Sequence, residues 1–183
     1  MLAQGSIFYG GPGTGKSILL KQLLARFVSH SLGVLGLAVY VSARALAEQL
    51  RQISHEVTFI ELLARIEPQR AGAIQRAHTQ ARLYVLLDGL DEVGHAPLTQ
   101  IGKLLQGART PFLATARPVH GPLDSFPTFL CFHIQPLNTE QVRSYLEAHD
   151  RSDLLAQLTA SRLSTHMTVP AALKELCETP LAL

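Results

Sequence analysis

The sequence predicts a three-layer α/β domain built on a five-stranded, mostly parallel sheet and followed by a small helical subdomain. Short runs rich in β-formers alternate with stretches of helical spacing as far as Gln135, and this alternation is typical of a sheet covered by helices. From Pro136 onward only helical patterns follow. We therefore expect a first domain over residues 1–136 and a helical subdomain over residues 137–183.

Hydrophobic spacing places the individual elements of both parts. Strands are expected at residues 6–10, 36–42, 83–87, 112–114 and 128–134, and helices at residues 17–28, 43–53, 58–68, 71–81 and 98–108. In the tail, Asn138 is the expected N-cap of a helix, with Gln141 completing a variant of the capping box. Further helices are expected at residues 152–163 and 169–183, the last broken at Pro180.

A glycine-rich stretch, GGPGTGKS, joins the first strand to the first helix. Its spacing fits the phosphate-binding pattern G-x-x-x-x-G-K-[ST], also called Walker A, in which glycines let backbone N–H groups turn toward a phosphate. Lys16 is expected to neutralise the β- and γ-phosphates, and Ser17 to ligate Mg²⁺. The candidate nucleotide-contacting residues are Gly10, Gly11, Pro12, Gly13, Thr14, Gly15, Lys16, Ser17 and Ile18.

A second motif follows the apolar run at residues 83–87, which suits a strand buried on both faces. Asp88 ends the run, and Asp91 and Glu92 follow it. Asp88 is placed to hold Mg²⁺ directly or through water, and either Asp91 or Glu92 to activate the water that attacks the γ-phosphate. Gly89 keeps the turn free of a side chain. The competing interpretation is a solvated acidic turn after an ordinary strand.

The stretch LLDGLDEV, residues 86–93, resembles the acidic signature of the NACHT branch of the STAND class of P-loop ATPases. It is more specific than a general Walker B strand, which needs only apolar residues and one or two acids. The resemblance implies ATP and Mg²⁺ as cofactors. No Asn-Lys-x-Asp stretch for reading guanine is present, which also favours ATP over GTP.

The stretch TPFLATARPVHG, residues 110–121, resembles the sensor strand of the same family, which ends in a Thr-small-Arg-Pro pattern. The resemblance implies that this strand lies between the glycine-loop strand and the acidic strand. It also implies that Arg117 faces the γ-phosphate, where a guanidinium could distinguish ATP from ADP. The alternative is a surface arginine at the start of a loop.

The tail is similar to the helical subdomain that follows the sheet in NACHT ATPases. In that family a proline near the end of the subdomain packs against adenine, so the resemblance implies this contact for Pro180; the alternative is a plain helix break. Family members usually also carry a sensing or effector region before the loop and a winged-helix module after the helices. The sequence holds neither of these, nor a counterpart of the winged-helix histidine that holds ADP.

Composition narrows the function classes further. A net charge of +2 gives no signal for nucleic acid or an anionic membrane, and no apolar run approaches the ~20 residues that a membrane span needs. Cys131 and Cys177 lie far apart in no metal-binding spacing and are expected to be reduced core thiols of a cytoplasmic protein. The eight histidines are scattered without the spacing of paired ligands.

The motifs together predict a slow ATPase that acts as a signalling switch. Its expected partners are ATP and ADP, further copies of the chain when ATP is bound, and effector or sensor domains of unknown identity. A first alternative is an AAA-type motor or loader, for which Arg109 is the candidate arginine finger. A second is a phosphotransferase, which would need an acceptor site and an arginine-rich lid that the sequence does not show.

Overall fold

The computed structural model describes residues 5–29, 36–118, 129–135 and 137–148. The chain forms two compact units. The larger comprises Met1–Tyr9 and Lys16–His133, and the smaller comprises Gly10–Gly15 and Ile134–Leu183.

The larger unit is organised around one parallel sheet. Its strands are β1 (Gly5–Tyr9), β2 (Leu37–Ser42), β3 (Leu83–Asp88), β4 (Phe112–Ala116) and β5 (Leu130–His133). They lie in the order β2-β3-β4-β1-β5, and each neighbouring pair is parallel. The predicted five strands are thus confirmed, and the predicted sensor strand β4 lies between β1 and β3.

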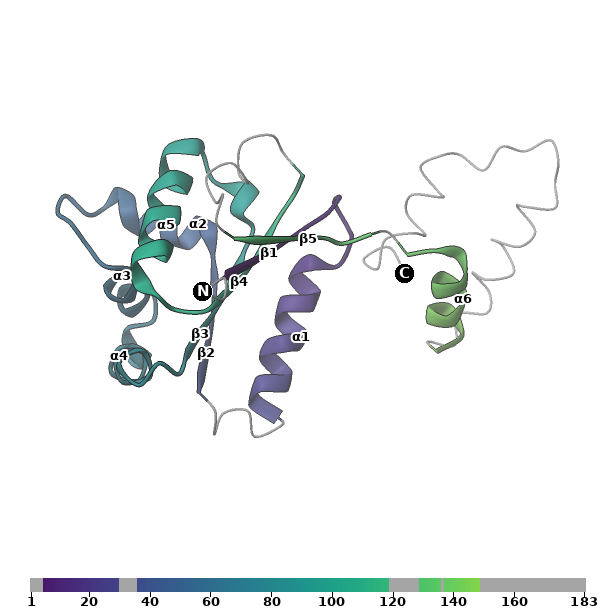
Figure 1. The fold of residues 1–183 in the computed structure, drawn as a ribbon, viewed down its shortest axis with the longest axis horizontal. Coiled ribbons are helices and arrows are strands. Elements are labelled where there is room, and N and C mark those ends of the chain that lie inside the picture. Colours follow the sequence, from purple (N-terminus) through teal and green to yellow (C-terminus); the bar gives the residue numbers. More distant parts are fainter. Residues whose placement is uncertain (1–4, 30–35, 119–128, 136, 149–183) are drawn as a thin grey trace. The chain divides into compact units, whose positions relative to one another are not determined.

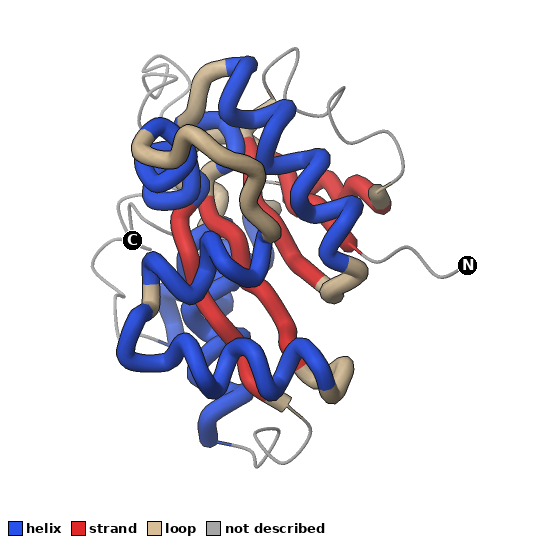
Figure 2. The backbone as a smooth tube through the Cα atoms, turned by 90° about the vertical axis from the view of Figure 1, so that its left-hand side faces the viewer, coloured by secondary structure: helices blue, strands red, loops and turns tan. Residues whose placement is uncertain are grey.

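Helices cover both faces of this sheet, as Figure 1 shows. One face carries α1 (Lys16–Ser29), and the other carries the helical layer, which we define as α2 (Ala43–Arg51), α3 (Phe59–Ile66), α4 (Ala71–Thr79) and α5 (His95–Ala108). Figure 2 views the sheet from the side of the helical layer. The main core lies between this layer and the sheet, and its fully buried side chains include Val39, Leu46, Leu63, Val85, Leu87 and Ile101.

Local capping explains where two helices of the layer begin. Ser42, the last residue of β2, accepts a hydrogen bond from the N–H of Ala45 at 3.2 Å and so starts α2. Thr58 caps α3 through its hydroxyl, and Glu61 accepts from the Thr58 N–H at 2.8 Å, which completes a capping box. α5 begins at His95, three residues earlier than predicted, because Pro97 is tolerated in a first turn whose N–H groups need no intrahelical partner.

The smaller unit contains the glycine loop and α6 (Thr139–Ala148). The predicted cap of α6 is confirmed: Asn138 Oδ1 accepts from the Gln141 N–H, and Gln141 Oε1 accepts from the Asn138 N–H, both at 2.9 Å. The helices expected at residues 152–163 and 169–183, including Pro180, lie outside the described residues. The boundary at residue 136 therefore stays a prediction.

The edge strand β5 corrects one expectation. Cys131 is a free thiol, but it is exposed rather than part of the core. The reason is that, among the described strands, β5 pairs only with β1, and each of its four residues is exposed, including Leu130 and Phe132. Cys177 lies outside the described residues.

Candidate functional site

Asp88, the last residue of β3, accepts hydrogen bonds from three hydroxyl groups on three different elements. Ser17 Oγ at the start of α1 donates to Asp88 Oδ1 at 3.0 Å, and Thr115 Oγ1 near the end of β4 donates to the same oxygen at 2.5 Å. Tyr40 on β2 donates to Asp88 Oδ2 at 2.7 Å. The carboxylate therefore joins α1 to the two strands that flank β3.

These side chains define what we call the carboxyl edge, because they gather where parallel strands end. α/β sheets bind their ligands at this end. The members of the carboxyl edge are Lys16, Ser17, Tyr40, Arg44, Asp88, Asp91, Glu92, Thr115 and Arg117.

The turn after Asp88 depends on a glycine, as the sequence predicts. Gly89 has a φ of +75°, and a Cβ at this position would lie 3.0 Å from Glu92 Cδ. Its N–H donates to Thr115 Oγ1 at 3.0 Å. A side chain at position 89 would therefore meet both backbone strain and a crowded neighbour.

The first acid of the turn is held by the candidate sensor arginine. Asp91 Oδ1 accepts from the backbone N–H of Arg117 at 2.9 Å, and Asp91 Oδ2 lies 3.2 Å from Arg117 Nε. The Asp91 side chain is 9% exposed, while that of Arg117 is 54% exposed. Asp91 thus fixes the backbone just beyond β4 and one side of the guanidinium.

The second acid is less constrained. Glu92 Oε2 lies 3.4 Å from a terminal nitrogen of Arg44 on α2, and both side chains are largely exposed. Such a pair contributes little to stability, because water competes for both charges. Among the described residues, the Glu92 side chain is thus held by one exposed ion pair, whereas that of Asp91 is mostly buried and contacts Arg117 through both oxygens.

Lys16 is the first residue of α1 and lies near charged groups of both signs. Partial burial lowers its pKa from the ordinary value, and nearby Arg117 acts in the same direction. Asp91 and Asp88 oppose this shift by favouring the charged amine. A cation in this position is well placed to exchange its contacts for those of an incoming anion.

The glycine loop has the backbone that its pattern requires. Gly13 and Gly15 have φ values of +76° and +82°, in the region that favours glycine. Thr14 Oγ1 donates to the Gly11 carbonyl at 3.0 Å, so the loop also closes on itself. A Cβ at Gly10 would lie 2.9 Å from the carbonyl oxygen of Ile134, which explains the need for glycine there.

The residues present fit a hard cation such as magnesium. Ser17 Oγ and Asp88 Oδ1 are hard oxygen ligands 3.0 Å apart, and Mg²⁺ typically takes one or two protein oxygens together with phosphates and waters. Among the described residues there is no group of three or more His, Cys, Asp or Glu side chains that could hold a metal. The oxygen pair therefore suits an ion that arrives with a nucleotide.

Three members of the carboxyl edge have contacts that sequence reasoning did not assign. Tyr40 and Arg44 were placed only in a strand and a helix, and Thr115 only at a strand end. The signal for Tyr40 is a hydroxyl inside the otherwise apolar run LAVYV, two residues before a strand's last residue. Thr115 is marked only by its place in the Thr-small-Arg-Pro pattern, and Arg44 carries no comparable signal.

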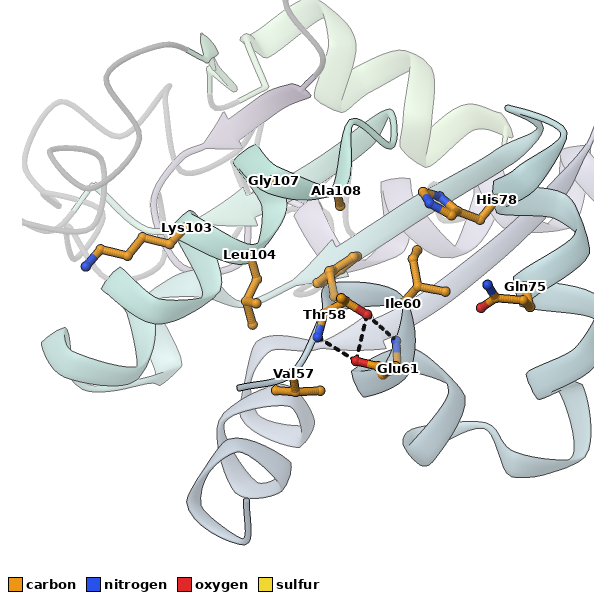
Figure 3. Close-up of a pocket in the computed structure, with 11 residues that line it drawn as sticks. Val57, Thr58, Ile60, Glu61, Gln75, His78, Lys103, Leu104, Gly107 and Ala108 are labelled. Atoms are coloured by element: carbon orange, nitrogen blue, oxygen red, sulfur yellow. Dashed lines mark hydrogen bonds between the residues drawn. The ribbon is translucent and has the colours of Figure 1, made fainter. Parts of the chain in front are cut away.

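A separate cavity of about 520 Å³ lies within the helical layer (Figure 3). It is lined by parts of α3, α4 and the last turns of α5, together with the capping pair Thr58 and Glu61. α5 runs from the carboxyl end of β3 to the amino end of β4, so its last turns lie toward the opposite end of the sheet. Within the described part of the chain, no member of the carboxyl edge lines this cavity.

No helix in the described part of the chain is both long enough and apolar enough to cross a membrane. Comparison with curated proteins finds no match. Among solved structures, the ORC1 protein of Aeropyrum pernix in complex with DNA is 19% identical with a TM-score of 0.47, covering 81% of this chain and 44% of that one. PCH-2 of C. elegans is 15% identical with a TM-score of 0.45, covering 85% and 41%. The chain thus spans less than half the length of either.

The family comparison is more specific. The model of the NACHT domain matches residues 4–153, which include the glycine loop, the whole sheet and α6. The observed sheet order, with β4 between the glycine-loop strand β1 and the acidic strand β3, agrees with the arrangement that this resemblance implies. The chain therefore belongs to the NACHT family of P-loop NTPase domains.

Proposed function

We propose that this chain is an ATP-binding switch domain that hydrolyses ATP slowly and couples its nucleotide state to assembly. The observation that carries the proposal is the 3.0 Å hydrogen bond from Ser17 Oγ to Asp88 Oδ1. A serine after the loop lysine and an aspartate at the end of another strand of the sheet are the pair that P-loop enzymes use to hold Mg²⁺ beside the β- and γ-phosphates. The family match supports the same assignment.

Each residue of the proposed site then has a separate role. Backbone N–H groups of residues 10–15 surround the phosphates, and Lys16 neutralises the β- and γ-phosphates. Ser17 and Asp88 hold Mg²⁺, directly or through water, and the bound ion supplies positive charge next to the phosphate that is transferred. Ile18 continues the helix behind the loop. Pro180 would pack against adenine.

For the water-activating group we propose Glu92, with Asp91 in a supporting role. Both carboxylate oxygens of Asp91 contact Arg117, so Asp91 is better suited to position this arginine than to take a proton. Within the described part of the chain, the Glu92 side chain has one exposed ion pair, to Arg44, and can release it to orient a water. Arg117, held at Nε, would turn its terminal nitrogens toward the γ-phosphate.

The family match favours a slow switch over a continuous motor. The motor alternative would need an arginine finger from a neighbouring copy. Its candidate, Arg109, caps the end of α5 with a φ of +52° and lies at the amino end of β4.

We further propose a cytoplasmic location, ATP-dependent self-association, and effector or sensor partners of unknown identity.

The proposal is tested by binding and turnover measurements on the whole chain. Lys16→Ala should weaken ATP binding at least ~10- to 100-fold in calorimetry, because it removes a charge-assisted contact to the phosphates. Glu92→Gln should keep ATP binding and slow phosphate release, because the amide cannot accept the proton of the attacking water. The parent protein should release phosphate slowly under steady-state conditions.

Lys21→Ala is the matched control, since Lys21 is an exposed lysine of the same helix. It should bind ATP like the parent. If Lys16→Ala also binds ATP like the parent while remaining folded, the phosphate-site assignment is wrong. Rapid steady-state turnover would favour the motor interpretation over the switch. Unchanged hydrolysis in Glu92→Gln would indicate that Asp91, and not Glu92, is the base.

A further inference from the structure

Tyr40 makes a contact with the site that no catalytic motif includes. It lies on β2, directly opposite Leu86 of β3, and Ser42 is opposite Asp88. Side chains on a strand alternate between faces, so Tyr40 and Asp88 project from the same face of the sheet. The Tyr40 hydroxyl reaches along the strand and donates to Asp88 Oδ2 at 2.7 Å.

The two oxygens of Asp88 have different partners. Oδ1 accepts from Ser17 and Thr115, while Oδ2 accepts from Tyr40. A carboxylate held at only one oxygen can rotate about its terminal torsion, which is broad for Asp. With Tyr40 on Oδ2, the rotation that would exchange the two oxygens breaks a charge-assisted hydrogen bond. The orientation of Oδ1 toward Ser17 is thereby fixed from the opposite side.

The direction of this hydrogen bond is also fixed. A phenol carries its proton at neutral pH and can donate it, whereas an ionised carboxylate can only accept. Tyr40 is therefore the donor to Asp88 Oδ2.

We propose that Tyr40 is a positioning residue for the divalent cation: by holding Asp88 Oδ2, it presents Oδ1 to the ion beside Ser17 and so sets the affinity for Mg²⁺. This inference rests on the proposed function, because it assumes that Mg²⁺ binds with ATP at Ser17 and Asp88. Partners that orient metal ligands in this way typically change metal affinity 10- to 100-fold when they are removed.

The test compares Tyr40→Phe, which removes only the hydroxyl, with Tyr84→Phe as the matched control. Tyr84 lies on the adjacent strand β3 and packs its ring against Phe27, outside the Asp88 network. ATP affinity is measured by calorimetry over a range of Mg²⁺ concentrations, and Mn²⁺ binding to the protein–ADP complex by electron paramagnetic resonance. Neither readout depends on hydrolysis.

We expect Tyr40→Phe to need about 10- to 100-fold more Mg²⁺ for half-maximal tightening of ATP binding. High Mg²⁺ should restore the parent affinity, and affinity for ATP without Mg²⁺ should not change. A purely structural role would not give this rescue. Tyr84→Phe should behave like the parent.

Three outcomes would overturn the inference. If the parent shows Mg²⁺-dependent binding and Tyr40→Phe matches it, the positioning role is wrong while the proposed function stands. If Tyr40→Phe weakens ATP equally with and without Mg²⁺, Tyr40 supports the fold instead of the ion. If the parent shows no Mg²⁺ dependence at all, the proposed metal site fails and this role fails with it.

Discussion

The carboxyl edge and the helical layer lie against the same sheet but are held together by different forces. In the layer, side chains such as Leu62 and Leu63 are completely buried in an apolar core. At the carboxyl edge, hydroxyls, acids and arginines from separate strands, helices and turns contact one another, and several of them are largely exposed. The first arrangement derives its energy from burial, and the second derives its geometry from directional polar contacts.

This difference teaches where stability and function reside. Burying a leucine completely contributes on the order of 1.5–3 kcal/mol, whereas an exposed ion pair such as Arg44–Glu92 contributes about 0–1 kcal/mol. The helical layer can therefore carry the stability of the larger unit, while the carboxyl edge is free to exchange its contacts for those of a ligand. Changes in the two regions should accordingly have separable effects.

The largest effect is expected from a cavity in the layer. Leu63→Ala should lower the free energy of unfolding by about 2–5 kcal/mol, because Leu63 is fully buried and its truncation leaves a void. Urea unfolding of the full chain measures this change. At a temperature where the variant stays folded, its ATP affinity should equal that of the parent.

The matched control is Val28→Ala on α1, where an apolar side chain is 79% exposed. It should change the free energy of unfolding by no more than about 0.5 kcal/mol. A loss of ATP affinity in folded Leu63→Ala would contradict the separation of stability from ligand binding. It would mean that the helical layer contributes directly to binding at the carboxyl edge.

The next-largest effect is expected from a substitution at the carboxyl edge, which should change ligand binding more than stability. Arg117→Ala should weaken ATP binding ~10- to 100-fold, because it would remove the proposed bidentate charged contact to the γ-phosphate, and should leave ADP binding nearly unchanged. The free energy of unfolding should fall by only about 1 kcal/mol, because the backbone N–H of residue 117 still donates to Asp91. Calorimetry with both nucleotides gives the contrast.

Arg65→Ala, which removes an exposed arginine from α3, controls for the loss of one positive charge. It should bind both nucleotides like the parent. Equal weakening of ATP and ADP in Arg117→Ala would mean that this arginine supports the whole cleft. No weakening of either would make it the surface arginine of the competing interpretation.

The same two regions show what a sequence can predict. The strands, the helices of the layer and the cap of α6 were predicted because each depends on periodicity or on residues three apart. Asp88, Asp91 and Glu92 were predicted as site residues because they end or directly follow a buried strand. The hydroxyl of Tyr40 and the pairing of Arg44 with Glu92 were not assigned, since their partners are 48 residues away in both cases.

Within the carboxyl edge, what the sequence could predict was therefore limited by the distance along the chain between contacting residues, and not by the chemistry of those residues. Spacing could not choose between Asp91 and Glu92, which are neighbours. Their different exposure and different arginine partners depend on where β2 and β4 lie beside β3. A burial error arose for the same reason: Cys131 lies in a run of β-formers, and only the sheet order reveals that β5 is an edge strand.

The smallest effect concerns the polar cap of the layer itself, at Thr58 and Glu61. Hydrogen bonds from the Thr58 backbone N–H, and then from its hydroxyl, lower the pKa of Glu61 from its ordinary value of 4.5, although Glu61 is exposed. A carboxyl group whose pKa is lower in the folded state stabilises the fold when it is ionised. This contribution is complete above the unfolded pKa and is lost as the pH falls through the folded pKa.

Glu61→Gln should therefore be slightly less stable than the parent at neutral pH, and the difference should close as the pH falls below about 4.5. Glutamine can still accept from the Thr58 N–H, so the substitution removes the charge and not the capping box. Urea midpoints of both proteins between neutral pH and about pH 3 measure the difference, and Thr58→Ser, which keeps the hydroxyl, should retain it. A difference that stays constant with pH would mean that packing, rather than ionisation, distinguishes the two side chains. A difference that widens as the pH falls would contradict the expected sign of the linkage. It would mean that ionised Glu61 does not stabilise the folded state through its hydrogen bonds to Thr58.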